Sequence, residues 1–315
     1  MKTYSHSGAV SPTGAIGALV ASLAAAVLCG FLYAYAFAYI PHIVLNVAVT
    51  VIFGLALGFI VAQAAERGKI RNNLVVGCLA VLTALFALYV YWGAYFWAFV
   101  GFNNIRQVGL YAFTPGGLYQ FGAHLFAKGS WSFSEGNPVR GTFLASLWVL
   151  EAVVVTGLTV IVSQWNAQRP FCETCQSWTN EQRSVARLLA TGGEPAWTNV
   201  LNGELPALAE FEPAPPGSRW YVRLDLARCP TCEHSRFLSI SQVMLHTDDK
   251  GQTKEVTRAL ISNAILSPAQ CAVVEACGQL YRQNLEADLD QPDLQPDAAE
   301  AGGSSAPDDE QGEAE

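Results

Sequence analysis

The chain has 315 residues, of which 51% are hydrophobic and 14% are charged. Charged residues make up about a quarter of an ordinary soluble protein, so this composition excludes a wholly soluble globular protein. Residues 1–163 contain seven Lys or Arg and three Asp or Glu, residues 164–285 contain eleven and twelve, and residues 286–315 contain none and eleven. We therefore divide the sequence into an apolar part, a polar domain and an acidic tail.

Four apolar segments in residues 1–163 are long enough to cross a hydrocarbon core of about 30 Å, which takes about 20 helical residues. They are residues 15–40, 43–62, 74–100 and 143–163. Only Pro41 and His42 separate the first two segments, and Pro41 cannot continue the preceding helix. The sequence therefore predicts a membrane all-α bundle of four helices that contacts the lipid bilayer.

Basic residues indicate the orientation of this bundle, because Lys and Arg gather on the cytoplasmic side of membrane helices. Three of them crowd the short loop between the second and third segments: Arg67, Lys69 and Arg71. Arg169 follows the fourth segment, whereas the long loop 101–142 holds few basic residues for its length. We expect both termini in the cytoplasm and this loop outside.

The outer loop 101–142 contains an amphipathic pattern. Leu118, Phe121 and Leu125 repeat at helical spacing after Pro115-Gly116-Gly117. Such a helix can lie on the membrane surface with its apolar face in the bilayer, and a partner-binding surface would have the same pattern. We favour the interfacial helix.

Glu151 is the only acidic or basic residue within the four apolar segments. A carboxylate in hydrocarbon is costly unless it is protonated or paired. Counting the rise per residue places Glu151 about 12 Å below the outer surface, level with Tyr91, Tyr33 and Thr50. We expect a carboxyl group that is hydrogen-bonded to these hydroxyls. It is either a proton- or substrate-binding group or a neutral acid that joins helices, and we favour the second interpretation.

Gly54 and Gly58 form a GxxxG motif in the second segment. This motif allows a neighbouring helix to approach closely. The neighbour is either another helix of the same bundle or a helix of a second copy, so a homo-oligomer stays open.

Two Cys-x-x-Cys pairs follow the apolar part: Cys172 with Cys175, and Cys229 with Cys232, with 53 residues between the pairs. Two such pairs supply four thiolates for a tetrahedral ion at about 2.3 Å. We expect one structural Zn²⁺ bound by these four cysteines, with His234 as an alternative ligand. Thiols stay reduced in the cytosol, which agrees with the orientation derived from the basic residues.

The second pair lies between two alternating segments, residues 220–226 and 237–243, which predicts a β-hairpin with the cysteines at its tip. A thioredoxin-type pair would instead open a helix in a βαβ unit, so the hairpin favours a metal over redox chemistry. We also predict a helix over residues 180–190 and a second helix that begins at Ser267-Pro268. Cys271 and Cys277 on the latter point to different faces and are expected to be buried.

The tail, residues 286–315, has no aromatic residue and eleven acidic ones, which predicts disorder. Residues 164–285 carry a net charge of −1, whereas nucleic-acid binding needs a basic surface. We therefore expect a small α+β zinc-ribbon-like domain over 164–285 whose partner is a protein rather than a nucleic acid.

The four apolar segments and the two cysteine pairs resemble uncharacterised bacterial multi-pass membrane proteins with a cytosolic zinc-ribbon domain. The resemblance implies a bacterial inner-membrane location and the four zinc ligands, and it names no activity. No catalytic constellation accompanies these features, so we expect a scaffold or adaptor rather than an enzyme. A small transporter or channel component that uses Glu151 is the alternative, followed by a membrane thiol oxidoreductase.

Overall fold

The computed structural model describes residues 1–40, 43–101, 104–129, 138–165, 169–189, 194–232, 235–247 and 252–289. The chain divides into two compact units. The helical unit comprises Lys2–Glu181 and Ala227–Phe237, and the sheet unit comprises Met1, Gln182–Leu226 and the described residues from Leu238 onwards. This division groups both cysteine pairs with the long helices.

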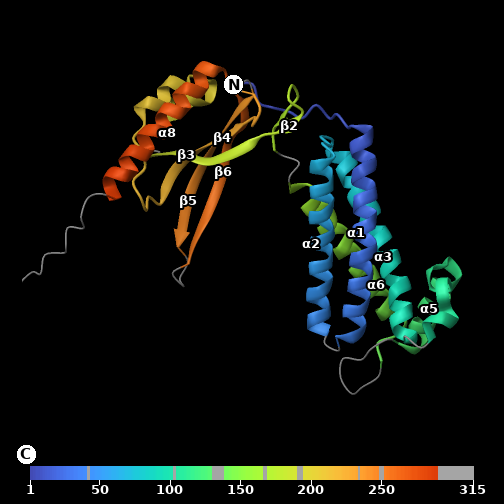
Figure 1. Ribbon diagram of the computed structural model, residues 1–315. Coiled ribbons are helices and arrows are strands. Elements are labelled where there is room, and N and C mark those ends of the chain that lie inside the picture. The colour runs from blue at the N-terminus through green and yellow to red at the C-terminus, as the bar shows by residue number, and fades with distance from the viewer. Residues whose placement is uncertain are drawn as a thin grey trace, which may run out of the picture. The chain divides into compact units, whose positions relative to one another are not determined.

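The helical unit contains four helices that are long and apolar enough to cross a membrane (Figure 1). They are α1 (Pro12–Tyr39), α2 (Ile43–Arg67), α3 (Asn73–Val100) and α6 (Gly141–Ser163). The four predicted segments are therefore confirmed as helices, with ends that differ by a few residues. Helix α1 packs against α3 and α2, and α2 also packs against α6.

Local chemistry defines the ends of these helices. The Ser11 side chain accepts a hydrogen bond from a first-turn N–H of α1, where Pro12 occupies the first position. Asn72 caps α3 by accepting hydrogen bonds from two N–H groups of its first turn. Helix α1 ends before Ile40, whose extended φ of −91° and ψ of 107° are typical of a residue that precedes proline.

The two glycines of the GxxxG motif lie against α6. A Cβ atom added at Gly54 would lie 3.0 Å from Leu158 Cβ, and one added at Gly58 would lie 2.7 Å from Val162 Cβ. The Thr159 hydroxyl reaches the Gly54 carbonyl across this contact at 3.3 Å. The motif therefore serves close packing of two helices within one chain.

Helix α5 (Pro115–Lys128) confirms the helix predicted in the outer loop. It follows the short helices α4 (Ile105–Val108) and η2 (Gly109–Phe113). Phe121 and Leu125 are buried, and the Phe121 ring stacks on Phe96 of α3 with 4.4 Å between centroids. The apolar face of α5 thus packs against the bundle, while a position on the membrane surface stays a prediction.

The rest of the fold is built on two sheets (Figure 1). The antiparallel pair is β1 (Phe171–Cys172) with β2 (Ser177–Trp178). The larger sheet has the order β3 (Asn180–Leu189), β4 (Trp220–Arg228), β5 (Arg236–Thr247) and β6 (Thr253–Ile265). Strands β4 and β5 confirm the two strands predicted on either side of the second cysteine pair.

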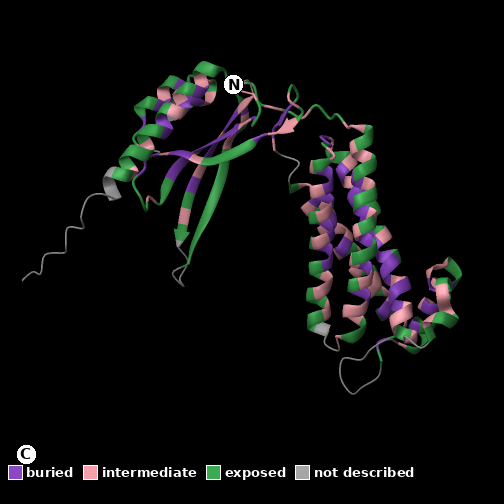
Figure 2. Cartoon of the chain, viewed as in Figure 1, coloured by how far each residue is buried: buried purple, intermediate pink, exposed green. Residues whose placement is uncertain are grey.

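Helices α7 (Glu194–Asn202), η4 (Leu205–Glu210) and α8 (Pro268–Leu289) complete the sheet unit. Their apolar side chains meet those of the strands in one core cluster, in which Leu224, Ile240 and Val274 are fully buried. Figure 2 shows buried positions along the strands and along the helix faces that cover them.

The helix predicted over residues 180–190 is wrong, because the structure places strand β3 at Asn180–Leu189. The segment contains strong helix formers such as Arg, Gln, Ala and Leu, which explains the prediction. Hydrogen bonding to β4 overrides that propensity and buries Val185, Ala186 and Leu188. A partner strand so distant in sequence leaves no local pattern.

Helix α8 begins where predicted. The backbone N–H of Ser267 donates to Gln270 Oε1 at 2.9 Å, and Ser267 Oγ accepts from the Gln270 N–H at 3.3 Å, which is a capping box. Cys271 and Cys277 are buried in the core, as expected. The acidic tail lies almost wholly outside the described residues, since α8 ends at Leu289.

Both edge strands of the larger sheet contain a residue with positive φ. Ser184 in β3 has φ of 53° and its N–H donates to Asp225 Oδ1 at 2.7 Å. Asn263 in β6 has φ of 52° and its N–H donates to Ser239 Oγ at 3.1 Å. Each of these N–H groups is therefore satisfied by a side chain where the extended backbone is interrupted.

Candidate functional site

The first cysteine pair lies on the turn between β1 and β2. Cys172 ends β1 and pairs with Ser177, which begins β2. Gln176 closes the turn with a left-handed φ of 50°. The Cys175 N–H points at Cys172 Sγ from 3.4 Å, so the turn wraps around the first sulfur.

The second cysteine pair lies in the connection between β4 and β5. The Cys229 N–H donates to the Ser235 carbonyl at 3.0 Å, which extends the ladder past the ends of the two strands. The Thr231 N–H points at Cys229 Sγ from 3.4 Å. Both pairs therefore use a tight turn that directs backbone N–H groups at a sulfur, while His234 falls outside the described residues.

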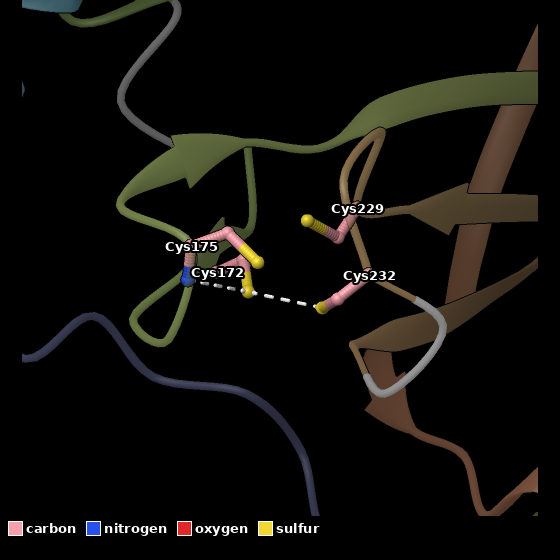
Figure 3. A group of neighbouring side chains, drawn as sticks. All are labelled: Cys172, Cys175, Cys229 and Cys232. Atoms are coloured by element: carbon pink, nitrogen blue, oxygen red, sulfur yellow. Dashed lines mark hydrogen bonds between the residues drawn. The ribbon is translucent and has the colours of Figure 1, made fainter.

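The four cysteines face one another from these two turns (Figure 3). Their Sγ atoms all lie within 4.8 Å of one another, so Cys172, Cys175, Cys229 and Cys232 can hold a metal ion. A tetrahedral ion with metal–sulfur bonds of about 2.3 Å separates its sulfurs by about 3.8 Å. The Cys172 and Cys232 sulfurs are 3.7 Å apart. We call these residues the four-cysteine cluster.

Two serines contact sulfurs of this cluster. Ser235 Oγ donates to Cys172 Sγ at 3.1 Å, and Ser177 Oγ lies 3.4 Å from Cys229 Sγ. Burial alone would raise the pKa of Cys229, but the hydrogen bonds from Ser177 and nearby backbone N–H groups lower it to about 6. The site is therefore prepared to carry negative charge at Cys229.

Cys175 behaves differently from Cys229 in the metal-free site. Its hydrogen bond with Cys232, followed by burial, raises the pKa of Cys175 to about 12. A proton thus stays on this sulfur at neutral pH until a cation replaces it. The two pKa shifts indicate that the sulfurs are close enough to share protons. A bound metal ion would replace these protons and neutralise the thiolates.

The loop between α2 and α3 holds the first cysteine turn. Arg71 of this loop has only 7% of its side chain exposed and donates to Glu173 Oε2 at 2.5 Å. Its guanidinium also lies 4.4 Å from the centroid of the Phe171 ring, a cation–π contact. Arg71 therefore contacts residues on both sides of Cys172 in the sequence.

Two further contacts join the same turn to the end of α2. Arg169 forms an ion pair with Glu66 at 2.8 Å and donates to the Thr179 carbonyl at 3.1 Å. The Trp178 indole N–H donates to the Glu66 carbonyl at 2.8 Å. Residues on both sides of the cysteine turn thus contact Glu66 at the end of α2.

The N-terminal segment before α1 runs along these groups. Ser7 Oγ donates to Glu173 Oε1 at 2.7 Å, so that Arg71 and Ser7 bind the two oxygens of one carboxylate. Tyr4 Oη accepts a hydrogen bond from the Phe171 N–H at 3.2 Å, and the Tyr4 ring packs edge-on against Phe237. The segment therefore contacts the chain next to both cysteine pairs.

The second group of predicted site residues meets inside the bundle. Tyr33 Oη lies 2.6 Å from Glu151 Oε1 and 2.7 Å from Thr50 Oγ1. The Tyr91 hydroxyl also interacts electrostatically with the Glu151 carboxyl. These four residues, which we call the carboxyl cluster, come from α6, α1, α2 and α3, so one side chain from each long helix meets at a single place.

Aromatic rings surround this cluster. The Tyr33 ring stacks on Phe53 with centroids 4.3 Å apart, and it lies 4.6 Å from the Tyr91 ring. Tyr33 has only 2% of its surface exposed, whereas Glu151 is partly buried. The hydroxyl partners of the carboxyl are therefore fixed by packing as well as by hydrogen bonds.

Comparison of the chain with known protein families, with curated proteins and with solved structures finds no match. The function must therefore be argued from the two clusters themselves.

Several residues of these sites carry no signal in the sequence. Ser177 and Ser235 follow the cysteine pairs by two and three positions, which is a weak indication of a second layer of contacts. In the sequence, Arg71 indicates only the orientation of the helices. The sequence predicts no role for Glu173 and Tyr4, because their contacts join segments separated by more than a hundred residues.

Proposed function

We propose that this protein is an integral membrane scaffold or adaptor, in which one structural zinc ion stabilises a domain that recruits a cytosolic protein partner. The four-cysteine cluster carries this proposal. It joins two turns that are far apart in sequence, and metal binding at such a site contributes directly to folding. Four sulfurs also fill all positions of a tetrahedral ion, which leaves none for a substrate.

Zinc is the metal that best suits the ligands. Thiolates select zinc, copper(I) and iron–sulfur clusters over magnesium or calcium. The sulfur separations fit a single ion, and two turns on β-hairpins support a zinc-ribbon arrangement. Neither Cys-x-x-Cys pair opens a helix in the described residues, which argues against a thioredoxin-type redox centre.

Metal analysis of the purified full-length protein tests the zinc proposal. We expect one zinc per chain, which Cys172→Ser removes and Cys78→Ser, a change at an exposed cysteine of α3, leaves in place. A protein purified in its metal-free form, with cysteines that cycle between dithiol and disulfide, would instead support the oxidoreductase.

Partner recovery tests the scaffold. The full-length protein, solubilised gently and purified by affinity, should retain a cytosolic protein, and Cys172→Ser should lose it. Recovery of no reproducible partner from the native protein would count against this function.

The expected location is a bacterial inner membrane with both termini in the cytoplasm. Arg67 ends α2, and Lys69 and Arg71 lie in the loop between α2 and α3, which supports this orientation. Tags at each terminus should be protected from protease in sealed right-side-out vesicles. Cleavage at both termini in such vesicles would reverse the assignment.

The carboxyl cluster favours a second candidate function, a small transporter or channel component. An acidic side chain that bonds to the Tyr33 hydroxyl within a bundle is typical of ion and proton pathways. Glu151→Gln should abolish flux in a reconstituted transporter and should leave partner binding by a scaffold unchanged. The same variant therefore separates the two functions.

A further inference from the structure

The carboxyl cluster forms a continuous line of hydrogen bonds from α6 to the backbone of α2. Glu151 Oε1 contacts Tyr33 Oη at 2.6 Å, and Tyr33 Oη contacts Thr50 Oγ1 at 2.7 Å. Thr50 Oγ1 then donates to the Asn46 carbonyl at 2.9 Å. Each separation is that of a formed hydrogen bond, so each needs one proton between its two oxygens.

Counting protons along this line fixes their positions. The Asn46 carbonyl can only accept, so the bond to it uses the single hydroxyl proton of Thr50. Tyr33 must then donate its own proton to Thr50 and has none left for the carboxyl. The third contact is complete only when Glu151 carries a proton and donates it to Tyr33.

An ionised carboxylate leaves the line one proton short. Tyr33 would donate to Glu151, and Thr50 would have to choose between Tyr33 and the Asn46 carbonyl. One contact would then bring two oxygens together without a proton, or the Asn46 carbonyl would keep only the helical hydrogen bond from the Thr50 N–H. Three protons for three contacts therefore require the neutral acid.

We infer that Glu151 is a proton-binding group, and that the hydrogen bond between Tyr33 and Thr50 reverses its direction when the proton leaves. The proton passes from the carboxyl to water as the carboxylate forms, and no other covalent bond breaks. Thr50 then turns its hydroxyl toward Tyr33 and releases the Asn46 carbonyl. Loss of one proton from α6 thus changes the hydrogen bonds of α1 and of the backbone of α2.

The surroundings select a proton over a metal cation. The titratable groups that face Glu151 are Tyr33 from α1 and Tyr91 and Tyr95 from α3. No basic residue and no second acid of the four long helices lies deep in the bundle, because Glu66 and Arg67 occur at the last turn of α2. One carboxyl with hydroxyl partners can bind a proton without any further ligand.

Asn46 offers a place for water on this line. Its side-chain Oδ1 is buried and has no hydrogen-bond partner among the described residues. It lies one helical turn from Thr50, and its own carbonyl loses a donor when the line reverses. A water molecule that donated to both oxygens would satisfy them.

Infrared spectroscopy of the full-length protein in lipid nanodiscs tests the proton directly. The difference between wild type and Glu151→Gln at neutral pH should contain the C=O stretch of a neutral carboxylic acid. Tyr33→Phe removes its hydrogen-bond acceptor, so the same band should persist and shift to higher frequency. Glu204→Gln, at an exposed acid of the sheet unit, should remove only carboxylate bands.

This inference deepens the second candidate function by naming the bound species, and the two fail separately. A difference spectrum for Glu151→Gln that contains only carboxylate bands would overturn the proton assignment. A neutral-acid band whose frequency is the same in Tyr33→Phe as in wild type would overturn the hydrogen-bonded line. A neutral band in a protein that moves no protons across liposomes would keep the proton-binding group and reject transport. Should Glu151→Gln not insert, the shift in Tyr33→Phe against wild type still decides the result.

Discussion

Arg71 in the loop between α2 and α3 forms an ion pair with Glu173, which lies between the two cysteines of the first pair. Arg71 is almost fully buried, whereas Glu173 keeps 45% of its side chain exposed. A buried guanidinium needs a fixed partner, because its desolvation is costly. The position of the cysteine turn is therefore tied to a loop that begins and ends at long apolar helices.

Arg71→Ala should make the metal site less stable although no ligand changes. It removes one charged hydrogen bond and one cation–π contact, together worth about 1–3 kcal/mol. We expect zinc loss to a chelator to be about tenfold faster, which corresponds to about 1.4 kcal/mol. Arg67→Ala, at an exposed arginine of the same segment, should leave the rate unchanged. Equal rates in the two variants would mean that the loop and the metal site are independent.

Ser235→Ala should weaken zinc binding more than a distant surface change. Its hydroxyl donates to Cys172 Sγ, and removal of such an outer contact typically costs about 10–100-fold in metal affinity. We expect the lower end of this range, since backbone N–H groups also point at the sulfurs. Competition with a zinc-binding dye measures the change, and Ser218→Ala, at a serine that binds only its own turn, is the control.

Zinc binding should release protons in a pH-dependent number. At about pH 7.5, Cys229 with its lowered pKa of about 6 is already a thiolate, while Cys175 with its raised pKa of about 12 holds a proton that zinc displaces. Below pH 6, Cys229 is protonated as well, so zinc must displace one more proton and its affinity falls more steeply. Calorimetry in buffers of different ionisation enthalpy counts these protons. A count that is the same above and below this pH would contradict the assigned order.

Gly58→Leu should destabilise the bundle. A Cβ atom at this position would lie 2.7 Å from Val162 Cβ and 3.0 Å from the Thr159 carbonyl, and overpacking of this kind costs about 1–3 kcal/mol. We expect a lower thermal midpoint in detergent without a change of oligomeric state. Gly157→Ala on α6 meets no atom within 4 Å and should keep the midpoint or raise it. A dimer that dissociates in Gly58→Leu would assign the motif to an interface between copies.

The long helices and both clusters could be predicted because each depends on a regular quantity. Apolar length defines the four helices, and the fixed rise per residue of a helix placed Glu151 level with Tyr33 and Thr50. The two Cys-x-x-Cys pairs specify a ligand set whatever lies between them. Such features need only spacing along the chain.

Strand β3 and the contacts of Arg71 could not be predicted in the same way. The strand depends on hydrogen bonds to β4, and the ion pair joins residues 102 positions apart in sequence. Neither leaves a periodic pattern near the residues involved. Local propensity pointed to a helix at residues 180–190, and long-range pairing decided otherwise.

The positive-φ residues Ser184 and Asn263 bear on how copies of this protein coexist. A protein confined to a bilayer meets its own copies at a high local concentration, and an open sheet edge invites strand exchange between them. The sheet ends in β3 on one side and in β6 on the other, and each carries one such interruption. These interruptions should therefore disfavour pairing between the edge strands of neighbouring copies, even at the high local concentration within a membrane.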